Sequence, residues 1–432
     1  MRQANQSLPG FRDLYPRDCA IRNYLFDAWR RVSSRYGFIE WDGPTLEATD
    51  LYRRKSGDEI TRQLFSFEDK GGREVALRPE LTPTIARMVA EKHRDFRKPM
   101  KWFQIGACFR YETPQKGRLR EFCQWNADVL GEPSIEADAE LIALGIDLLR
   151  ELGFASPDFA VRVSNRDLWN QFVLEEKIDA GRTTEFLQVI DKWDREKAKN
   201  LEESLVGLGT SPSAVAAFIE RMRSERTPFM PLVNALAARG LDQFVRVEPG
   251  IVRGLAYYTG TVFEFFALRG GRAIAGGGRY DGLCALISDG AAKLPAAGFA
   301  MGDVVLADLI ASTPRANTGL QQFLGRAGAL DAYVIVADEA HRAQAVAILQ
   351  KLRDAGLRCD YAMAPAKVSK QFQTAEALHA RTAIIIGSEF PVIKIKDLAS
   401  RQETAGDLSA LVDLVAAVLA QEPQGPMLAE ES

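Results

Sequence analysis

The sequence predicts an α+β protein with hairpin strands and separate helices, followed by a small α/β domain. Strand patterns joined by short polar turns lie between residues 68 and 130, which favours neighbouring antiparallel strands. A charged, helix-forming stretch at about residues 165–245 separates them from later strand patterns, which indicates an insertion. From about residue 330 to residue 420, strands and helices alternate, as is typical of an α/β domain.

The composition is that of a soluble globular protein of two or three domains, with 432 residues, 47% hydrophobic and 26% charged. The net charge of −3 excludes a globally basic nucleic-acid-binding protein, but not a local basic patch. No apolar run reaches membrane-spanning length, and the N-terminal residues lack a signal peptide's apolar core. We therefore expect a cytoplasmic protein with no membrane partner.

Neither a metal centre nor a disulfide framework is expected. The five cysteines are scattered without a Cys-x-x-Cys pair, which indicates reduced thiols. The three histidines, His93, His341 and His379, lie far apart in the sequence. The sequence therefore predicts no metal ion held by the protein alone and no histidine-based catalytic triad.

The N-terminal region predicts an ordered arm at residues 8–15 and a helix from Pro16, because proline suits a first helical turn. Gly37 ends this helix, and residues 38–41 form a strand. Apolar residues recur at helical spacing along one face of the helix, namely Ile21, Tyr24, Leu25, Ala28, Trp29 and Val32. This stripe belongs either to a dimer interface or to the core of its own chain.

Residues 68–73 predict a hairpin turn before a strand that ends at Glu80. Thr82 is expected to cap a helix that has Pro83 at its first position. Glu80 would thus lie at a strand end beside a helix N-terminus. A carboxylate there either binds a ligand or merely caps the helix.

A second pair of strands, residues 100–109 and 121–130, encloses a turn rich in basic residues. The period of two along the later strand places polar side chains on one face. The residues of that face are Phe122, Gln124, Asn126 and Asp128. Because buried polar groups need hydrogen-bonding partners, a polar ligand above this face is predicted.

Residues 253–260 and 275–282 predict two strand-and-turn segments. The three consecutive glycines at 276–278 indicate backbone that turns tightly or approaches a ligand closely. The arginines and tyrosines of both segments suit a phosphate or carboxylate ligand. A plain strand with surface arginines fits the same pattern.

A tight passage from a strand into a helix is predicted at residues 298–310, and the polar residues 311–329 predict a linker. Strands are then predicted at 332–337, 357–362, 382–386 and 391–395, and helices at 340–355 and 367–380. No Gly-x-Gly-x-x-Gly follows the first of these strands, which argues against a dinucleotide site.

Over nearly the whole chain, these motifs resemble the histidyl-tRNA synthetases. Residues 37–44, 109–122 and 298–302 are similar to the three motifs of class II synthetases. The family-specific blocks are Leu-Arg-Pro-Glu at 77–80, Pro-Gln-Lys-Gly-Arg at 114–118, Arg-Gly-Leu at 253–255 with two tyrosines at 257–258, and Gly-Gly-Arg-Tyr-Asp at 277–281.

The resemblance implies the antiparallel sheet of class II synthetases, flanked by helices, with the helical insertion at about residues 165–245. It also implies how the chain is divided. The parts are a catalytic domain at residues 1–315, a linker at 316–329, an anticodon-binding α/β domain at 330–420 and a disordered tail at 421–432.

The implied activity is activation of histidine by ATP, with Mg²⁺, and transfer of histidine to a histidine tRNA by a homodimer. The attacking carboxylate is already ionised, so the reaction needs positioning and charge stabilisation and not a general base. The resemblance places Arg110 and Arg253 as catalytic residues at the α-phosphate. Glu112, Arg118 and Gln124 are implied as further contacts to ATP.

For histidine, the resemblance places Glu80 on the α-amino group, helped by Thr82 and Gln124. Asp128 and Tyr258 take the two imidazole nitrogens. The other residues implied at the histidine site are Tyr257, Tyr280, Arg110 and Arg253. The residues implied at the acceptor end of the tRNA are Gln115, Lys116, Arg118 and Arg120.

Three positions depart from the family pattern. Ala256 replaces the usual acid after Arg-Gly-Leu, Asp128 replaces a glutamate, and residues 303–305 lack the arginine of the third motif. The alternative function is that of a synthetase-like regulatory subunit, which binds histidine and controls a histidine-biosynthetic enzyme. The Arg-Gly-Leu block and the terminal α/β domain favour the enzyme.

Overall fold

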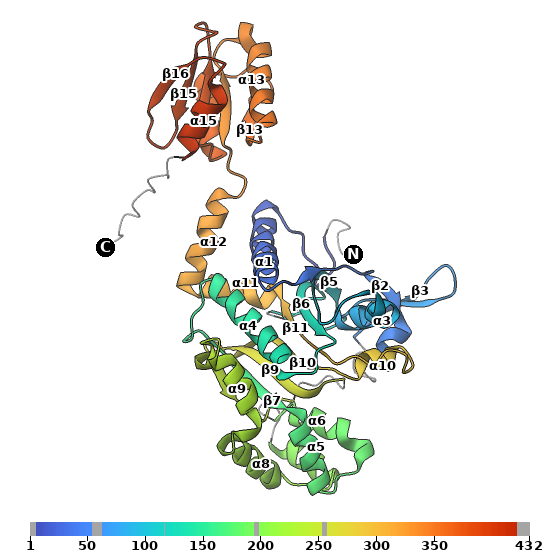
Figure 1. The fold of residues 1–432 in the computed structure, drawn as a ribbon. Coiled ribbons are helices and arrows are strands. Elements are labelled where there is room, and N and C mark those ends of the chain that lie inside the picture. Colours follow the sequence, from blue (N-terminus) through green and yellow to red (C-terminus); the bar gives the residue numbers. More distant parts are fainter. Residues whose placement is uncertain (1–5, 54–62, 116, 194–197, 253–256, 421–432) are drawn as a thin grey trace. The chain divides into compact units, whose positions relative to one another are not determined.

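The computed structural model describes residues 6–53, 63–115, 117–193, 198–252 and 257–420 (Figure 1). The chain forms two compact units, residues 1–320 and 321–432, which are described in turn. No helix within the described ranges is long and apolar enough to cross a membrane. The tail predicted at residues 421–432 lies outside the described residues.

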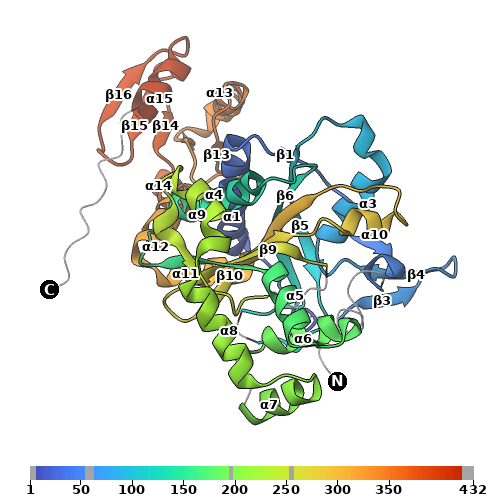
Figure 2. The same cartoon turned by 60° about the horizontal axis from the view of Figure 1, so that its bottom comes forward.

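An eight-stranded sheet forms the centre of the first unit, and its strands can be followed in Figures 1 and 2. In spatial order the strands are β1 (Ile39–Glu40), β5 (Met100–Phe109), β6 (Glu121–Leu130), β11 (Ala296–Gly302), β10 (Arg272–Arg279), β9 (Thr259–Ala267), β7 (Phe159–Asn165) and β8 (Val245–Val247). The edge pairs β1–β5 and β7–β8 are parallel, and the pairs between them are antiparallel. The antiparallel sheet of the predicted α+β fold is confirmed, and β5 and β6 have the predicted bounds.

A smaller antiparallel sheet lies before α3 (Thr82–Lys92) and contains β2 (Leu46–Ala48), β4 (Glu74–Leu77) and β3 (Phe65–Glu68). The predicted hairpin turn joins β3 to β4. The Asp69 carboxylate closes this turn by accepting hydrogen bonds from the backbone N–H groups of Gly71 at 2.8 Å and Arg73 at 3.0 Å. A short 3-10 helix, η1 (His93–Asp95), follows α3.

The two faces of the eight-stranded sheet meet different helices, because side chains alternate along each strand. On one face lie α1 (Pro16–Arg35), α4 (Ile135–Glu151) and α11 (Asp303–Ser312), and Trp125 of β6 donates from Nε1 to Ser33 Oγ of α1 at 3.1 Å. On the other face, Asn126 donates from Nδ2 to Thr82 Oγ1 of α3 at 3.3 Å. Helix α10 (Leu283–Ile287) packs against α3. The polar face predicted for β6 is therefore the α3 face.

The apolar stripe of α1 packs inside its own chain. Leu25, Ala28, Trp29 and Val32 are each at most 1% exposed, and the Trp29 ring stacks on the Trp125 ring at a centroid distance of 6.1 Å. These four residues therefore belong to the core of the chain, where α4, α11 and the sheet cover them. Ile21 and Tyr24 of the same stripe are only partly buried, and the predicted homodimer stays a prediction.

The predicted helical insertion is confirmed between β7 and β8. It contains α5 (Arg166–Glu175), η2 (Ala180–Arg182), α6 (Thr183–Ile190), α7 (Ala198–Gly207), α8 (Pro212–Ser224), η3 (Thr227–Phe229), α9 (Met230–Ala237) and η4 (Asp242–Phe244). The rings of Trp169 and Phe218, 4.7 Å apart, lie in a core that belongs to these helices. Trp169 also donates from Nε1 to the carbonyl oxygen of Pro249 at 2.8 Å, which ties the insertion to the segment after β8.

Gly277 and Gly278 lie inside β10, so of the alternatives predicted for these glycines the tight turn is wrong and the plain strand is the one that the structure has. A Cβ atom on Gly277 would lie 2.3 Å from the carbonyl oxygen of Gly298 in β11. A Cβ atom on Gly278 would lie 2.6 Å from the carbonyl oxygen of Thr261 in β9. Glycine is required here because the neighbouring strands approach closely.

Arg279, at the end of β10, binds an internal carboxylate. Its Nε donates to Asp138 Oδ2 of α4 at 2.9 Å, and its Nη1 donates to the carbonyl oxygen of Glu132 at 3.2 Å. Burial raises the pKa of Asp138 to about 6, and the nearby charge of Arg279 opposes that rise. Arg279 therefore fastens the first turn of α4 to the sheet, and its guanidinium already has a carboxylate partner within the chain.

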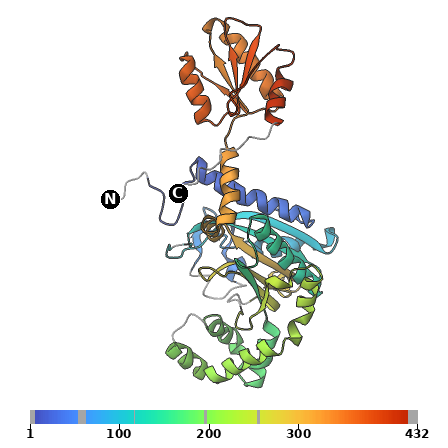
Figure 3. The same ribbon diagram turned by 90° about the vertical axis from the view of Figure 1, so that its left-hand side faces the viewer.

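The second unit contains a five-stranded sheet, which Figure 3 shows with its helices. Its strands, in spatial order, are β13 (Cys359–Tyr361), β12 (Ala332–Val336), β14 (Thr382–Ile386), β15 (Ile393–Asp397) and β16 (Glu403–Gly406). The first three are mutually parallel, and the last two are added antiparallel. The predicted α/β domain is confirmed, whereas β16 was not predicted.

Helices cover both faces of this second sheet. Helix α13 (Arg342–Asp354), which follows η5 (Glu339–His341), and helix α15 (Leu411–Ala420) pack on the face that carries Val334. Helix α14 (Val368–Ala377) packs on the face that carries Tyr333. Helix α12 (Pro314–Arg326) occupies most of the segment predicted as a linker, and the domain boundaries predicted from the sequence stay predictions.

We expect Arg279→Ala to destabilise the first unit by about 3–5 kcal/mol, because it leaves the buried carboxylate of Asp138 without its charge partner. The folded-state pKa of Asp138, already above its unfolded-state value, would rise further. A carboxyl group whose pKa is higher in the folded state than in the unfolded state destabilises the fold as the pH rises toward the folded-state pKa. The free energy of unfolding lost in Arg279→Ala should therefore be larger at about pH 8 than at about pH 5. Denaturant unfolding at both pH values measures this loss.

Arg150→Ala is the matched control for that experiment. Arg150 also pairs with a carboxylate, Asp147, at 2.9 Å, but its side chain is 56% exposed. Such a surface pair contributes at most about 1 kcal/mol. Equal losses of stability in the two variants would contradict the buried role of Arg279.

Candidate active site

Five of the predicted histidine-binding side chains, from segments far apart in the sequence, meet on the α3 face of the sheet. Tyr257 Oη donates to Glu80 Oε2 at 3.2 Å, and Tyr280 Oη donates to Asp128 Oδ1 at 2.5 Å. The Tyr257 ring lies 4.7 Å from the Tyr258 ring and 6.0 Å, edge-on, from the Tyr280 ring. The site therefore consists of two buried phenol–carboxylate pairs joined by an aromatic cluster.

Glu80 follows the end of β4 and comes two residues before the start of α3. It is 6% exposed. The prediction that Thr82 caps α3 is wrong, because the cap position is Leu81 and no side chain caps the helix there. Thr82 is the first helical residue, and its hydroxyl accepts a hydrogen bond from Asn126 on β6. The Thr82 hydroxyl thus lies next to the polar face of β6, as its predicted role in binding requires.

Asp128 is fully buried, and its two carboxylate oxygens have different surroundings. Burial raises the pKa of Asp128 to about 7, and the hydrogen bond from Tyr280 to Oδ1 opposes that rise. No residue that the structure describes donates a hydrogen bond to Oδ2. A buried carboxylate oxygen without a donor is costly, so this atom is suited to receive an N–H group from a ligand.

Both phenols of these pairs are neutral donors at neutral pH. Burial raises the pKa of Tyr257, and the charge of Glu80 raises it further. Burial raises the pKa of Tyr280 in the same way, with Asp128 as its charged neighbour. Neither hydroxyl is an acid or base near pH 7, so their role is to orient carboxylates or ligands.

Gln124 lies on the same face of β6 and is 9% exposed. Its Oε1 atom lies 3.4 Å from the thiol of Cys108 on β5, which donates to it. Burial raises the pKa of Cys108 to about 12, so this group is a thiol and not a nucleophilic thiolate. Cys108 was not predicted near the site, and only the pairing of β5 with β6 brings it there.

Arg110 links the basic turn to the loop that carries Glu80. Its Nε donates to the carbonyl oxygen of Pro79 at 3.0 Å, and its guanidinium lies 5.2 Å from the centre of the Phe122 ring. Arg110 is thereby held at the end of β5, beside the polar face of β6. A guanidinium in this position can bind a phosphate or carboxylate group.

Glu112 and Arg118, both predicted to bind ATP, form an ion pair across the basic turn. Glu112 Oε2 lies 3.7 Å from Arg118 Nη1. The turn is closed by reciprocal backbone hydrogen bonds between Gln115 and Arg118, of 3.1 and 2.8 Å. Gln115 and Arg118 are exposed, as a contact to a large partner requires.

Arg120 makes contacts within the chain through both its side chain and its backbone. Its Nε donates to the carbonyl oxygen of Glu112 at 3.0 Å, and its guanidinium lies 4.4 Å from the centre of the Tyr111 ring. The backbone N–H of Arg120 donates to the carbonyl oxygen of Gly10 at 2.9 Å. Arg120 therefore braces the base of the turn and joins it to the N-terminal arm.

Two charged residues near the site were not predicted. Arg166, the first residue of α5, is 5% exposed, and burial lowers its pKa while the neighbouring Tyr258 and Asp191 oppose the change. Asp303, at the start of α11, accepts a hydrogen bond from Arg12 Nη2 at 2.7 Å and another from the backbone N–H of Cys123 at 2.9 Å. Only tertiary contacts identify these partners: Arg166 belongs to no predicted block, and Asp303 was noted only as part of the passage from β11 into α11.

Three of the residues discussed from the sequence, Arg253, Ala256 and Lys116, lie outside the described residues. Their predicted roles stay predictions. Among the residues that the structure describes, no group of three or more His, Cys, Asp or Glu side chains could hold a metal ion.

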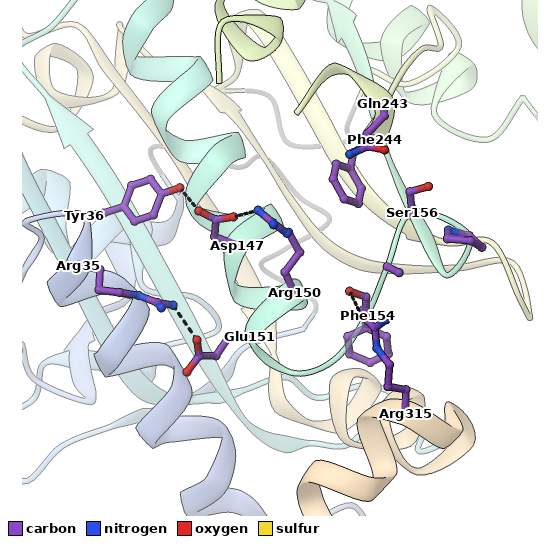
Figure 4. Close-up of a pocket in the computed structure, with 12 residues that line it drawn as sticks. Arg35, Tyr36, Asp147, Arg150, Glu151, Phe154, Ser156, Gln243, Phe244 and Arg315 are labelled. Atoms are coloured by element: carbon purple, nitrogen blue, oxygen red, sulfur yellow. Dashed lines mark hydrogen bonds and ion pairs between the residues drawn. The ribbon is translucent and has the colours of Figure 1, made fainter. Parts of the chain in front are cut away.

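A separate open hollow of about 840 Å³ contains none of the predicted site residues (Figure 4). It lies where the end of α1 meets the end of α4. Tyr36 Oη donates there to Asp147 Oδ2 at 2.6 Å, and Arg35 Nη2 donates to Glu151 Oε2 at 2.9 Å. The two carboxylates of this hollow, Asp147 and Glu151, thus both accept hydrogen bonds within the chain, in contrast to Asp128 Oδ2.

Comparisons with known proteins identify relatives over most of the chain. A family model described as Histidyl-tRNA synthetase matches residues 10–303, and one described as Anticodon binding domain matches residues 331–417. The histidine–tRNA ligase of Opitutus terrae is 41% identical over 433 residues, covering 92% of this chain and 95% of that protein.

Solved structures share the fold. The histidyl-tRNA synthetase of Nostoc sp. PCC 7120 has a TM-score of 0.75 at 23% identity, covering 96% of this chain and 100% of that chain. A Bacillus halodurans protein, described as an ATP phosphoribosyltransferase regulatory subunit/histidyl-tRNA synthetase, has a TM-score of 0.68 at 21% identity, covering 87% and 97%. These likenesses concern the fold alone. The first family model and the relative from Opitutus terrae extend over most of the sequence, and the chain therefore belongs to the histidyl-tRNA synthetase family.

Proposed function

We propose that the protein is a histidine–tRNA ligase. It would activate L-histidine with ATP, giving histidyl-adenylate and pyrophosphate, and then transfer histidine to the 3′ end of histidine tRNA. The observation that carries this proposal is the pair of buried carboxylates, Glu80 and Asp128, each bound by a phenol on the α3 face of the sheet. Two separated anionic groups suit the α-ammonium group and the imidazole N–H of histidine.

Histidine would bind with its ammonium group on Glu80, assisted by Thr82 and Gln124. Its imidazole N–H would meet Asp128 Oδ2, and Tyr258 would contact the other ring nitrogen. Tyr257 and Tyr280 line the pocket. An apolar amino acid would leave Asp128 Oδ2 without a donor, which supports strong discrimination against it.

ATP would bind beside the basic turn, with Arg110 and Arg253 at the α-phosphate and Glu112, Arg118 and Gln124 as further contacts. The histidine carboxylate is ionised at neutral pH, so the two guanidinium groups need only position the reactants and stabilise developing charge. Mg²⁺ usually binds through one or two carboxylates and substrate phosphates, so we propose that it enters with ATP.

The tRNA would make two sets of contacts. Its acceptor end would meet the basic turn through Gln115, Lys116, Arg118 and Arg120. Its anticodon would be read by the α/β unit, within residues 330–420. The homodimer implied by the resemblance and the cytoplasmic location expected from the lack of a membrane-spanning run are also part of the proposal. Leu25, Ala28, Trp29 and Val32 are buried in their own chain, so a dimer would use other residues.

Histidine-dependent exchange of labelled pyrophosphate into ATP tests the proposed function. The ligase should catalyse this exchange, because formation of histidyl-adenylate is reversible. A regulatory subunit of the same fold would bind histidine without exchange. A folded protein that binds histidine but catalyses no exchange would therefore overturn the ligase proposal and favour the regulatory function.

We expect Arg253→Ala to lower the rate of histidine activation about 10²–10³-fold, because it removes one group that stabilises charge in the transition state. Affinity for histidine and ATP should change much less. Arg253→Lys should restore only part of the rate, since an ammonium group lacks the planar, two-pronged geometry of guanidinium. Single-turnover kinetics measure these rates. Lost thermal stability with unchanged activity per folded molecule would instead indicate a structural arginine.

A chain truncated after residue 330 should activate histidine but charge tRNA poorly, because the α/β unit would be missing. Pyrophosphate exchange and tRNA charging, measured on the same preparation, separate the two steps. Circular dichroism checks that the remaining unit is folded. A proportional loss of both activities in a folded truncation would argue against the proposed division of labour.

A further inference from the structure

The phenol–carboxylate pair of Tyr280 and Asp128 contains an asymmetry that the proposed function leaves unexplained. One carboxylate oxygen, Oδ1, accepts the Tyr280 hydroxyl at 2.5 Å. The other, Oδ2, is buried and has no donor among the residues that the structure describes. Tyr280 is 1% exposed, and its single hydroxyl proton is already used by Oδ1.

The backbone around this pair holds both partners in place. The Tyr280 N–H donates to the carbonyl oxygen of Ala296 at 2.8 Å, and the Asp281 carboxylate accepts the N–H of Ala296 at the same distance. Gly298 is the direct neighbour of Asp128 in the β6–β11 register. A Cβ atom on Gly298 would lie 2.0 Å from Asp128 Oδ1, so the carboxylate rests against bare backbone.

We propose that Tyr280 is a positioning residue that acts through Asp128: it holds Oδ1 so that Oδ2 alone is presented to the imidazole N–H of histidine. This inference rests on the proposed function, since it concerns the same histidine pocket. The short aspartate side chain has two rotatable bonds, and the hydroxyl and Gly298 together select one orientation. Without the hydroxyl, the carboxylate could turn and share its charge between two positions.

The ionisable groups that face Asp128 predict a pH signature. Among the residues that the structure describes, they are Tyr280 itself, Cys284 of α10 and, through Tyr280, Tyr258. Burial raises the pKa of Cys284 to about 12 and the pKa of Tyr280 above its ordinary value. Asp128, with its pKa raised to about 7, is therefore the group of this set that changes charge near neutral pH.

Tyr280→Phe is the test, with kcat/KM for histidine measured by pyrophosphate exchange between about pH 6 and about pH 9. We expect KM for histidine to rise about 10- to 100-fold, the effect of losing one hydrogen bond to a charged group, while KM for ATP stays unchanged. The hydroxyl lowers the pKa of Asp128, so its loss should move the acid limb of the profile to higher pH, by about one unit. Free histidine titrates identically with both proteins, so the shift belongs to the enzyme.

Tyr36→Phe is the matched control, because Tyr36 Oη also donates to a carboxylate, Asp147, at 2.6 Å, outside the site. It should leave KM for histidine and the pH profile unchanged. A Tyr280→Phe variant with unchanged KM would overturn the inference. A raised KM without a shifted acid limb would also overturn it, because Tyr280 would then act on the ligand directly or on the fold.

Calorimetric titration of histidine in the absence of ATP separates this inference from the proposed function. Histidine binding without exchange would refute the ligase but still allow the comparison of Tyr280→Phe with the unaltered chain. Equal histidine affinity in those two proteins would refute the positioning role alone. A chain that binds no histidine would refute both.

Discussion

The burial of a carboxylate on the face of a β-sheet is the constraint on which the candidate site depends. Asp128 lies in the middle of the eight-stranded sheet, between β5 and β11, with no exposed surface. A buried charge costs several kcal/mol unless hydrogen bonds compensate, so the surrounding strands must leave space and supply donors. Gly298 leaves the space, Tyr280 supplies one donor, and the second is left to a ligand.

Close strand packing extends this constraint to the neighbouring strands. β11 can approach β10 because Gly277 has no side chain, and β9 can approach because Gly278 has none. Tyr280 follows directly after β10, so the position of its ring depends on the same glycines. The glycines therefore serve the site indirectly, by setting the strand spacing from which the tyrosine reaches the aspartate.

The basic turn is coupled to the site through backbone carbonyl groups. Arg110 binds the carbonyl oxygen of Pro79, next to Glu80, and Arg120 binds that of Glu112. The N-terminal arm adds a third link, because Gly10 accepts the N–H of Arg120 and Arg12 binds Asp303 at the start of α11. Of these contacts, the Arg110 hydrogen bond is the one that reaches the loop carrying Glu80. Arg12 binds Asp303 at the start of α11, the helix in which this sequence lacks the arginine of the third motif.

Local patterns in the sequence determined the elements and the chemistry they carry. The periods of two and 3.6 predicted β5, β6 and α1, and the polar face of β6 pointed to a ligand before any contact was known. Such patterns report backbone conformation and burial, which are properties of neighbouring residues. The family motifs then supplied roles for Glu80, Asp128 and the tyrosines, which the structure brings together.

Only the tertiary structure decided what each element packs against. Leu25, Ala28, Trp29 and Val32 of α1 are buried against their own chain, and the guanidinium of Arg279 binds Asp138. The glycines of β10 served strand packing, and Tyr280 bound Asp128. In each case the partner lies far away in the sequence, so no local pattern could name it. A side chain's local surroundings show that it needs a partner, and the fold determines which one it finds.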